Sequence, residues 1–221
     1  MNGASGGLTS LAHTYLVYRY TILFYTLIFT FVSLPILSSL KFSGTLLECM
    51  LAASLLAAIL PVNGVRNRPW LLVALVLIWI ARPLTHWYDH DVTSAVILGI
   101  WTLIGLVAAA AALRFAMRAS RVDAEHLYAA LSAYLLAGIY FGISYWLLEQ
   151  VSPGALRGTG QFSKTGALYF SFVTLATLGY GDITPHSDIA RGLAIVEGVG
   201  GQLFLAVLVA RLVSLYSRSE N

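Results

Sequence analysis

Residues 177–182, with the sequence Thr-Leu-Gly-Tyr-Gly-Asp, carry the clearest chemistry in the chain. Gly179 and Gly181 stand at alternating positions, and glycine adopts positive φ with little steric cost. Positive φ at alternating positions turns successive carbonyl groups to one side of an extended chain, where their oxygens can replace the water around a monovalent cation. The Thr177 hydroxyl would add an oxygen below these carbonyls. The segment is therefore a candidate cation site built from main-chain oxygens.

The residues just before this segment predict the element that positions it. Gly166 to Ala176 form an apolar stretch that is too short to cross a bilayer but long enough for a re-entrant half-helix. Such a half-helix would direct its carboxyl end, which carries partial negative charge, at the cation. Tyr180 would point outward and pack against the half-helix. One chain supplies only part of a ring of oxygens, so the site requires a closed symmetric oligomer.

Composition identifies the surroundings of this site as a membrane. The chain has 221 residues, of which 58% are hydrophobic and 10% charged, against about 25% charged residues in an ordinary globular protein. These values exclude a soluble enzyme and a disordered chain. The net charge of +3 comes from scattered basic residues, which form no nucleic-acid surface. The single cysteine excludes an intramolecular disulfide and a cysteine-based metal cluster.

Apolar runs predict an all-α membrane protein with six transmembrane helices, at about 20 residues per span. The predicted spans are residues 22–40, 45–62, 70–84, 92–113, 127–148 and 189–216. The re-entrant half-helix and residues 177–182 fall between helices five and six. The third span is the least regular, because Arg82 and Pro83 interrupt it.

Basic residues predict the orientation of the chain, because short cytoplasmic loops collect Lys and Arg. With the amino terminus inside, eight of the 13 basic residues are cytoplasmic. We therefore expect a multi-pass protein of the plasma or inner membrane, in contact with membrane lipid and with both termini cytoplasmic. The loop between helices five and six, residues 149–188, is then external.

The segment resembles the selectivity filter of potassium channels, and the resemblance extends beyond it. Residues 167–182 align without gaps with the pore helix and filter of simple bacterial potassium channels. Six spans with the pore between the last two are similar to the voltage-gated channel architecture. The resemblance implies a potassium-selective homotetramer that conducts K+ passively. It also implies K+ ions in the filter, no organic cofactor and no enzymatic activity.

The filter residues of that family map onto this chain position by position. The implied ion-binding residues are Thr177, Leu178, Gly179, Tyr180 and Gly181, and the implied filter supports are Tyr169, Phe170, Thr174 and Asp182. Tyr169 and Phe170 replace the family's usual tryptophan pair, and Tyr169 is placed to hydrogen-bond Asp182. Leu178 replaces the usual Val or Ile. Val173 stands where some bacterial relatives carry a glutamate partner for the aspartate.

The last span carries three candidate gating or cavity residues. Gly201 falls on the family's gating-hinge glycine, and Gln202 would then face the water-filled cavity. The alternative is that the glycines here permit close helix packing, as small residues do in membranes. Glu197 is an intramembrane carboxylate, which is costly and indicates a function. We expect it behind the filter or at a subunit interface. In the fifth span, Gly138 and Gly142 predict helix packing.

The first four spans resemble a voltage sensor in their position only. The fourth span, residues 92–113, contains no charged residue. Arg114, Arg118 and Arg121 share one helical face just beyond it, which is typical of an interfacial linker and leaves weak voltage sensing open. The predicted divisions are a cytoplasmic segment 1–21, a four-helix domain 22–113, a linker 114–125, a pore domain 126–217 and a tail 218–221.

The sequence leaves three other functions open. A poorly selective monovalent cation channel would result if Leu178 loosens the filter. An intramembrane metalloenzyme could use His86 and His90, which would share a helical face beside Asp89 and Asp91. A non-conducting subunit could modulate other channels. We expect no attached cytoplasmic domain, so gating would come from the filter, the helix bundle, lipid, tension or a separate cytoplasmic regulator.

Overall fold

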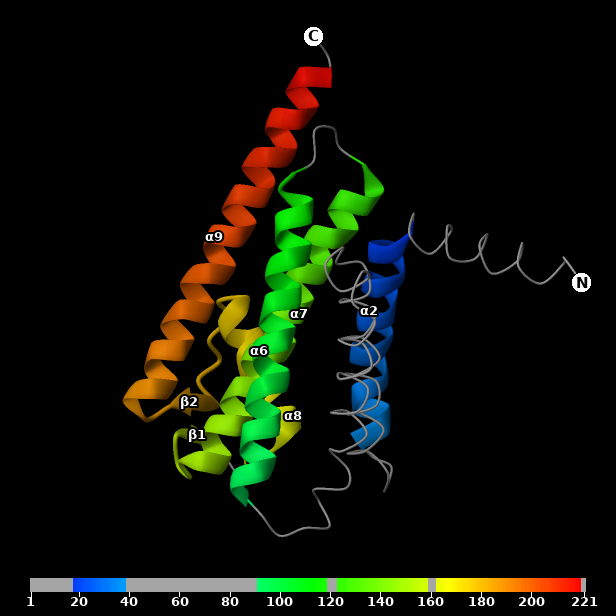
Figure 1. Ribbon diagram of the computed structural model, residues 1–221. Helices are drawn as coiled ribbons and strands as arrows, with labels where there is room; N and C mark the ends of the chain where they lie inside the picture. Colours follow the sequence, from blue (N-terminus) through cyan, green and yellow to red (C-terminus); the bar gives the residue numbers. More distant parts are fainter. Residues whose placement is uncertain (1–17, 39–90, 119–122, 159–161, 220–221) are drawn as a thin grey trace, which may run out of the picture. The chain divides into compact units, whose positions relative to one another are not determined.

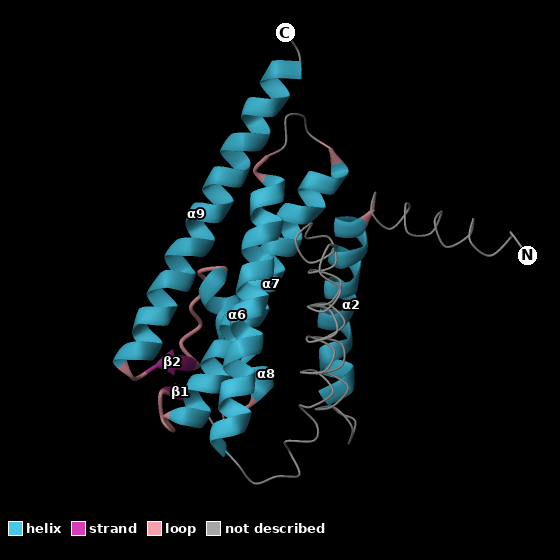
Figure 2. Cartoon of the chain, in the orientation of Figure 1, coloured by secondary structure: helices cyan, strands magenta, loops and turns pink. Residues whose placement is uncertain are grey.

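The computed structural model describes residues 18–38, 91–118, 123–158 and 162–219 (Figure 1). These residues are mostly helical (Figure 2). In chain order the elements are α2 (Arg19–Ser38), α6 (Asp91–Ala116), α7 (Ala124–Val151), β1 (Leu156–Gly158), α8 (Lys164–Leu175), β2 (Ile183–Pro185) and α9 (Asp188–Ser219). The predicted second and third spans and the predicted cluster around His86 and His90 lie outside the described residues.

Three of the described helices are long and apolar enough to cross a membrane. The parts that qualify are Ala95–Ala116 of α6, Ala124–Val151 of α7 and Asp188–Ser217 of α9, at the places of the predicted fourth, fifth and sixth spans. A shorter apolar helix, Arg19–Ser33 of α2, lies at the predicted first span. At 1.5 Å per residue, even the shortest of the three, with 22 residues, covers about 33 Å, which matches a hydrocarbon core of about 30 Å.

The chain divides into two compact units, and each is described by itself. The first unit comprises residues 1–83 and 110–133, and the second comprises residues 84–109 and 134–221. In the first unit, aromatic side chains join the starts of α2 and α7 to the end of α6. The ring of Tyr20 stacks on Phe115 with centroids 4.6 Å apart, and Phe24 meets Tyr128 at 5.3 Å.

The second unit is built around α8, the short yellow helix of Figure 1. Its buried cluster consists of Tyr145, Ala155, Leu156, Ala167 and Phe170. Two glycines of α7 allow α8 to approach closely. A Cβ added to Gly142 would lie 2.9 Å from the Leu168 Cα, and one added to Gly138 would lie 2.5 Å from the Phe172 ring. The prediction that this glycine pair serves helix packing is confirmed.

A short antiparallel pairing closes the second unit at one end. β1 follows α7 and pairs with β2, which precedes α9, so that Leu156 is opposite Pro185 and Gly158 is opposite Ile183. The end of α7 and the start of α9 therefore lie on the same side. The chain between them, including α8, leaves that side and returns to it. With 12 residues, α8 is about 18 Å long, which is well short of a bilayer core of about 30 Å.

We predict that Gly142→Ala destabilises the protein while Gly99→Ala does not. The Gly142 methyl group would collide with the backbone of α8, whereas a methyl group on Gly99 would make an ordinary contact 3.6 Å from Leu147. Overpacking of this kind costs about 1–3 kcal/mol, and replacing an unstrained helical glycine gains about 0.5–1 kcal/mol. Thermal midpoints of the purified variants in detergent measure both effects. Equal midpoints for the two variants would contradict the close packing of α8 on α7.

Candidate functional site

The residues that end α8 also begin the predicted filter segment. The helix starts at a serine cap, where the Ser163 hydroxyl accepts a hydrogen bond from the Gly166 N–H at 3.0 Å. At the other end, the Thr177 N–H donates to the Thr174 carbonyl at 3.0 Å and the Leu178 N–H donates to the Val173 carbonyl at 2.9 Å. This pair of bonds is the Schellman motif, which satisfies the last helical carbonyls and places the residue after the cap in the left-handed region.

The backbone beyond α8 has positive φ at every second residue. The φ angles are 56° at Thr177, 57° at Gly179 and 80° at Gly181. The positive φ predicted for the two glycines is confirmed. Thr177 was not predicted to share this conformation, and a β-branched residue adopts it at a cost of about 1–2 kcal/mol. The Schellman motif requires the left-handed conformation at this position, so the chain retains threonine there in spite of the strain.

This segment is uncovered on one side within a single chain. The side chains of Leu178 and Tyr180 are 57% and 67% exposed. A Cβ built on Gly179 or Gly181 would meet no heavy atom within 4 Å among the described residues. The segment therefore rests on α8 along one side only, and the other side is open to ions, to solvent or to further copies of the chain.

The predicted filter supports lie behind this segment. The ring of Tyr169 on α8 stacks on Tyr180 with centroids 6.4 Å apart and planes 10° from parallel, so Tyr180 packs against α8 as predicted. A hydrogen bond to the Asp182 carboxylate raises the pKa of Tyr169, and this is the contact expected from the sequence. Phe170 is buried edge-on against Tyr145 at 4.8 Å. Thr174 contributes the carbonyl that receives the Thr177 N–H.

The three residues predicted for gating occupy different places on α9. A Cβ on Gly201 would lie 2.6 Å from the Leu175 carbonyl oxygen, so this glycine lets α9 pass against the last turn of α8. Gln202 is exposed, and its amide donates to the Thr177 hydroxyl at 3.3 Å. Glu197 is fully buried. The structure thus separates Glu197 from the surface shared by Gln202 and Thr177 and places it behind α8.

The residues predicted for a linker or weak voltage sensing lie at the end of α6. Arg114 is in the last turn of α6, and Arg118 follows the helix; both are exposed. Arg121 lies outside the described residues.

Sequence reasoning missed two hydroxyl groups that surround Glu197. Tyr145 on α7 donates to one carboxyl oxygen at 2.7 Å, and the other oxygen contacts the Ser171 hydroxyl on α8. Ser171 also donates to the Gly138 carbonyl at 2.6 Å. Both hydroxyl residues are completely buried. A buried serine in an otherwise apolar half-helix is a signal for such a partner, because buried hydroxyls need hydrogen bonds.

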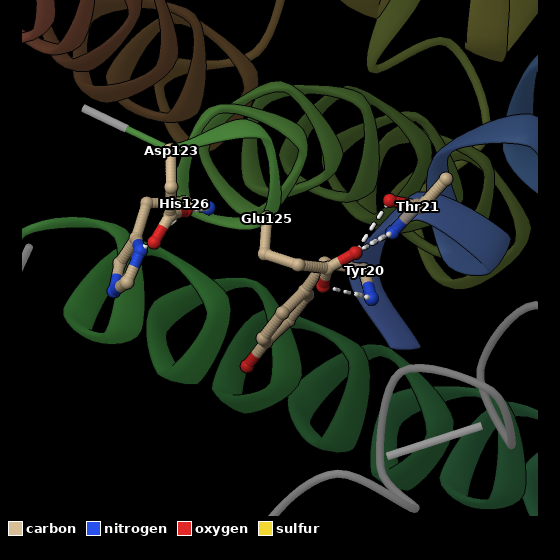
Figure 3. Close-up of polar contacts among 5 residues, drawn as sticks. All are labelled: Tyr20, Thr21, Asp123, Glu125 and His126. Carbon is tan, nitrogen blue, oxygen red and sulfur yellow. Dashed lines mark hydrogen bonds and ion pairs between the residues drawn. The ribbon is translucent and has the colours of Figure 1, made fainter. Parts of the chain in front are cut away.

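The first unit contains a second polar network that the sequence did not predict (Figure 3). The Glu125 carboxylate accepts hydrogen bonds from the Tyr20 and Thr21 N–H groups at 3.0 and 3.2 Å, and from the Thr21 hydroxyl. It therefore caps the start of α2 from the first turn of α7.

Asp123 caps α7 itself, accepting the His126 N–H at 2.8 Å. Partial burial of the Asp123 carboxyl opposes its ionisation, but hydrogen bonds from the His126 backbone and ring outweigh it and lower the pKa. An aspartate at the start of an apolar run is a recognisable helix start.

Comparison with known proteins assigns the class of the chain. Residues 130–218 match the family model described as Ion channel. The chain is 31% identical over 100 residues to Protein LctB of Geobacillus stearothermophilus, and the match covers 42% of this chain and 74% of that protein. Over 85 residues it is 33% identical to the inward rectifier potassium channel Kirbac3.1 of Paramagnetospirillum magnetotacticum, covering 38% of this chain and 28% of the relative.

A further relative is two-pore potassium channel 4 of Arabidopsis thaliana, which is 46% identical over 68 residues, or 28% of this chain and 24% of the relative. The chain thus spans less than a third of the length of the last two relatives. No solved structure matches it significantly. The chain belongs to the potassium channel superfamily. It is accordingly a membrane channel protein and not an enzyme, which confirms the resemblance predicted from residues 167–182.

We predict that Gly201→Ala lowers the thermal midpoint of the protein, because the new methyl group would collide with the Leu175 carbonyl. The expected cost is about 1–3 kcal/mol. Gly192→Ala on the same helix is the control, since a Cβ there meets no described heavy atom within 4 Å. A Gly201 that serves only as a hinge would leave the midpoint unchanged and alter only the open probability of the channel.

Proposed function

We propose that the protein is a potassium-selective channel, in which the carbonyl oxygens of Thr177 to Gly181 coordinate K+ in single file. The observation that carries this proposal is the positive φ at Thr177, Gly179 and Gly181. An ordinary strand directs alternate carbonyls to opposite sides. Changing the sign of φ at every second residue supports a row of carbonyls on one side of the chain. Such a row is the arrangement that replaces a cation's hydration shell.

A homotetramer supplies the remaining ligands. The segment from Leu178 to Gly181 is open on one side in a single chain, as one quarter of a closed ring would be. α9 supports the same assembly, because it is a long apolar helix with exposed side chains such as Leu203, Val207 and Val213. Lipid and neighbouring subunits together would cover these side chains. The carboxyl end of α8 then adds partial negative charge beside the cation.

The polar contacts of the two units support the proposed topology of six spans. Glu125 caps α2, so the starts of α2 and α7 lie on one side of the first unit. With the spans proposed at residues 45–62 and 70–84, the chain crosses the membrane four times between the start of α2 and the start of α7, which keeps both starts on the same side. One additional span would place them on opposite sides. In the second unit, the β1–β2 pairing supports a re-entrant path for α8, our proposed pore helix. We place both termini on the cytoplasmic side of the plasma or inner membrane, and the β1–β2 end on the opposite, external side.

Ion selectivity depends on the packing behind the filter. Tyr169, Tyr180 and Asp182 form a lateral support. Thr174 fixes the end of α8, and Phe170 anchors its middle against Tyr145. Leu178 is the one filter side chain that departs from the family's β-branched pattern. If it loosens the ring, the channel conducts monovalent cations with poor selectivity, and this is the second function that the exposure of Leu178 supports.

The test of the proposal is the reversal potential of the purified protein in a planar bilayer with K+ on one side and Na+ on the other. We expect reversal far toward the potassium equilibrium potential. Reversal near zero would favour the poorly selective channel, and Leu178→Val should then restore selectivity. A verified tetramer that conducts neither ion would contradict conduction and favour a modulatory subunit.

We predict that both K+ conductance and K+ over Na+ selectivity depend on the hydroxyl group at position 177. Thr177→Ser keeps the oxygen and removes the β-branch that the positive φ disfavours, so it should retain K+ over Na+ selectivity. Thr177→Ala removes the oxygen and should reduce K+ conductance by about tenfold, the equivalent of one good hydrogen bond. Single-channel recordings of both variants measure the effect. Equal conductance would show that Thr177 contributes only its carbonyl group.

A further inference from the structure

The buried carboxyl group of Glu197 connects three helices of the second unit. Tyr145 of α7 donates to its Oε2 atom at 2.7 Å, and Ser171 of α8 contacts its Oε1 atom. Glu197, Tyr145 and Ser171 are each fully buried. The ion pairs recorded among the described residues, His126 with Asp123 and Arg191 with Asp188, do not involve it. The family assignment gives no role to this cluster.

Counting the hydrogen atoms of the cluster determines which group donates. The Ser171 hydroxyl has one hydrogen and lies within hydrogen-bond distance of two oxygens, the Gly138 carbonyl at 2.6 Å and the Glu197 carboxyl. A carbonyl and an ionised carboxylate can both only accept, so the single serine hydrogen cannot serve both oxygens, and once it goes to the carbonyl the carboxyl contact needs another hydrogen. The Tyr145 hydrogen belongs to the other carboxyl oxygen. The contact between Ser171 and Glu197 therefore lacks a hydrogen unless the carboxyl group carries one.

A protonated Glu197 satisfies every contact in the cluster. It donates to the Ser171 oxygen and accepts from Tyr145, while Ser171 donates to Gly138. An ionised Glu197 would compete with the Gly138 carbonyl for the single serine hydrogen and leave one of the two acceptors without it. It would also place a charge in the buried interior of the unit, which is costly even beside hydrogen-bonding groups.

The position of the cluster connects it to the filter. Ser171 lies one helical turn before Leu175, and the Leu175 carbonyl is the atom against which Gly201 packs and to which the Tyr134 hydroxyl donates at 3.3 Å. The proposed filter segment begins at Thr177, two residues after Leu175. α8 is thus held to α7 and α9 at two successive turns, one at Ser171 and one at Leu175. The contacts at Ser171 are polar and depend on Glu197.

We propose that Glu197 acts as a neutral hydrogen-bond donor that fixes the pore helix behind the filter, and is not a charged group of the conduction pathway. This makes it a positioning residue for the cation site. The inference rests on the proposed channel function for its effect on conduction.

The test compares Glu197→Gln with Glu197→Ala. Glutamine keeps one donor for Ser171 and one acceptor for Tyr145, so K+ flux from liposomes containing the purified protein should stay close to the wild-type rate. Alanine removes both and should lower the flux by about tenfold or more. Ser171→Ala should resemble Glu197→Ala. The matched control is Ser144→Ala, because Ser144 is half-buried and, among the described residues, bonds only to the Tyr140 carbonyl of its own helix.

Infrared spectroscopy tests the proton directly and does not depend on conduction. Wild-type protein at neutral pH should show a protonated-carboxyl band that is absent from Glu197→Gln, while Asp188→Asn, which removes a fully exposed acid, should leave the band in place. A missing wild-type band, or a Glu197→Gln flux as low as that of alanine, would overturn the proposal. If Glu197→Ala does not assemble, the K+ flux and the infrared band of Glu197→Gln, each compared with wild type, test the proposal. A wild type without K+ flux would refute the channel function, and the band would still decide the protonation of Glu197.

Discussion

The carboxyl end of a helix leaves carbonyl groups unpaired, and at the end of α8 those carbonyls belong to the buried Val173 and the half-buried Thr174. The chain meets this constraint by turning at once into the Schellman motif, which uses the N–H groups of Thr177 and Leu178. The same turn places Thr177 at positive φ, and this positive φ recurs at every second residue, at Gly179 and Gly181. The cap of α8 and the geometry of the proposed filter are therefore one structure. Strain at Thr177 is the local cost of joining them.

A short helix in this position needs strong lateral support, because its own hydrogen bonds are few. Two kinds of contact supply it. Glycines at positions 142 and 201 allow neighbouring backbones to come within van der Waals distance, and Gly138 makes room for the Phe172 ring. Hydroxyl groups on Ser171 and Tyr145 add directional bonds to Glu197. Close packing resists translation of α8, and the directional bonds resist its rotation, so the two sets are complementary.

Much of this arrangement could be predicted from local sequence. The positive φ at Gly179 and Gly181 followed from residue type, and the packing role of Gly138 and Gly142 followed from their spacing. The packing of Tyr180 against α8 followed from the outward direction expected for its side chain, although its partner Tyr169 was not named in advance. The left-handed Thr177 was missed because propensity opposes it and only the helix cap requires it.

Contacts between distant segments were also missed. Tyr145, Ser171 and Glu197 are separated by 26 to 52 residues, and no periodicity within one helix indicates which hydroxyl will face which carboxyl. For Glu197 the sequence could state the cost of burial but not the partners that compensate it. The sequence allowed Gly201 to be either a gating hinge or a helix-packing residue. The packing contact is visible only in the distance from Gly201 to the Leu175 carbonyl.

The cap that Glu125 places on α2 has a consequence for biosynthesis. Glu125 is separated from Thr21 by 104 residues, so at a translation rate of about 5–20 residues per second it is made roughly 5–20 s after the helix start that it completes. During that interval the first N–H groups of α2 must be hydrated or bound by the insertion machinery. Helix α2 therefore enters the membrane with an unfinished end, and the chain can complete it only after Glu125, the 125th of 221 residues, has been made.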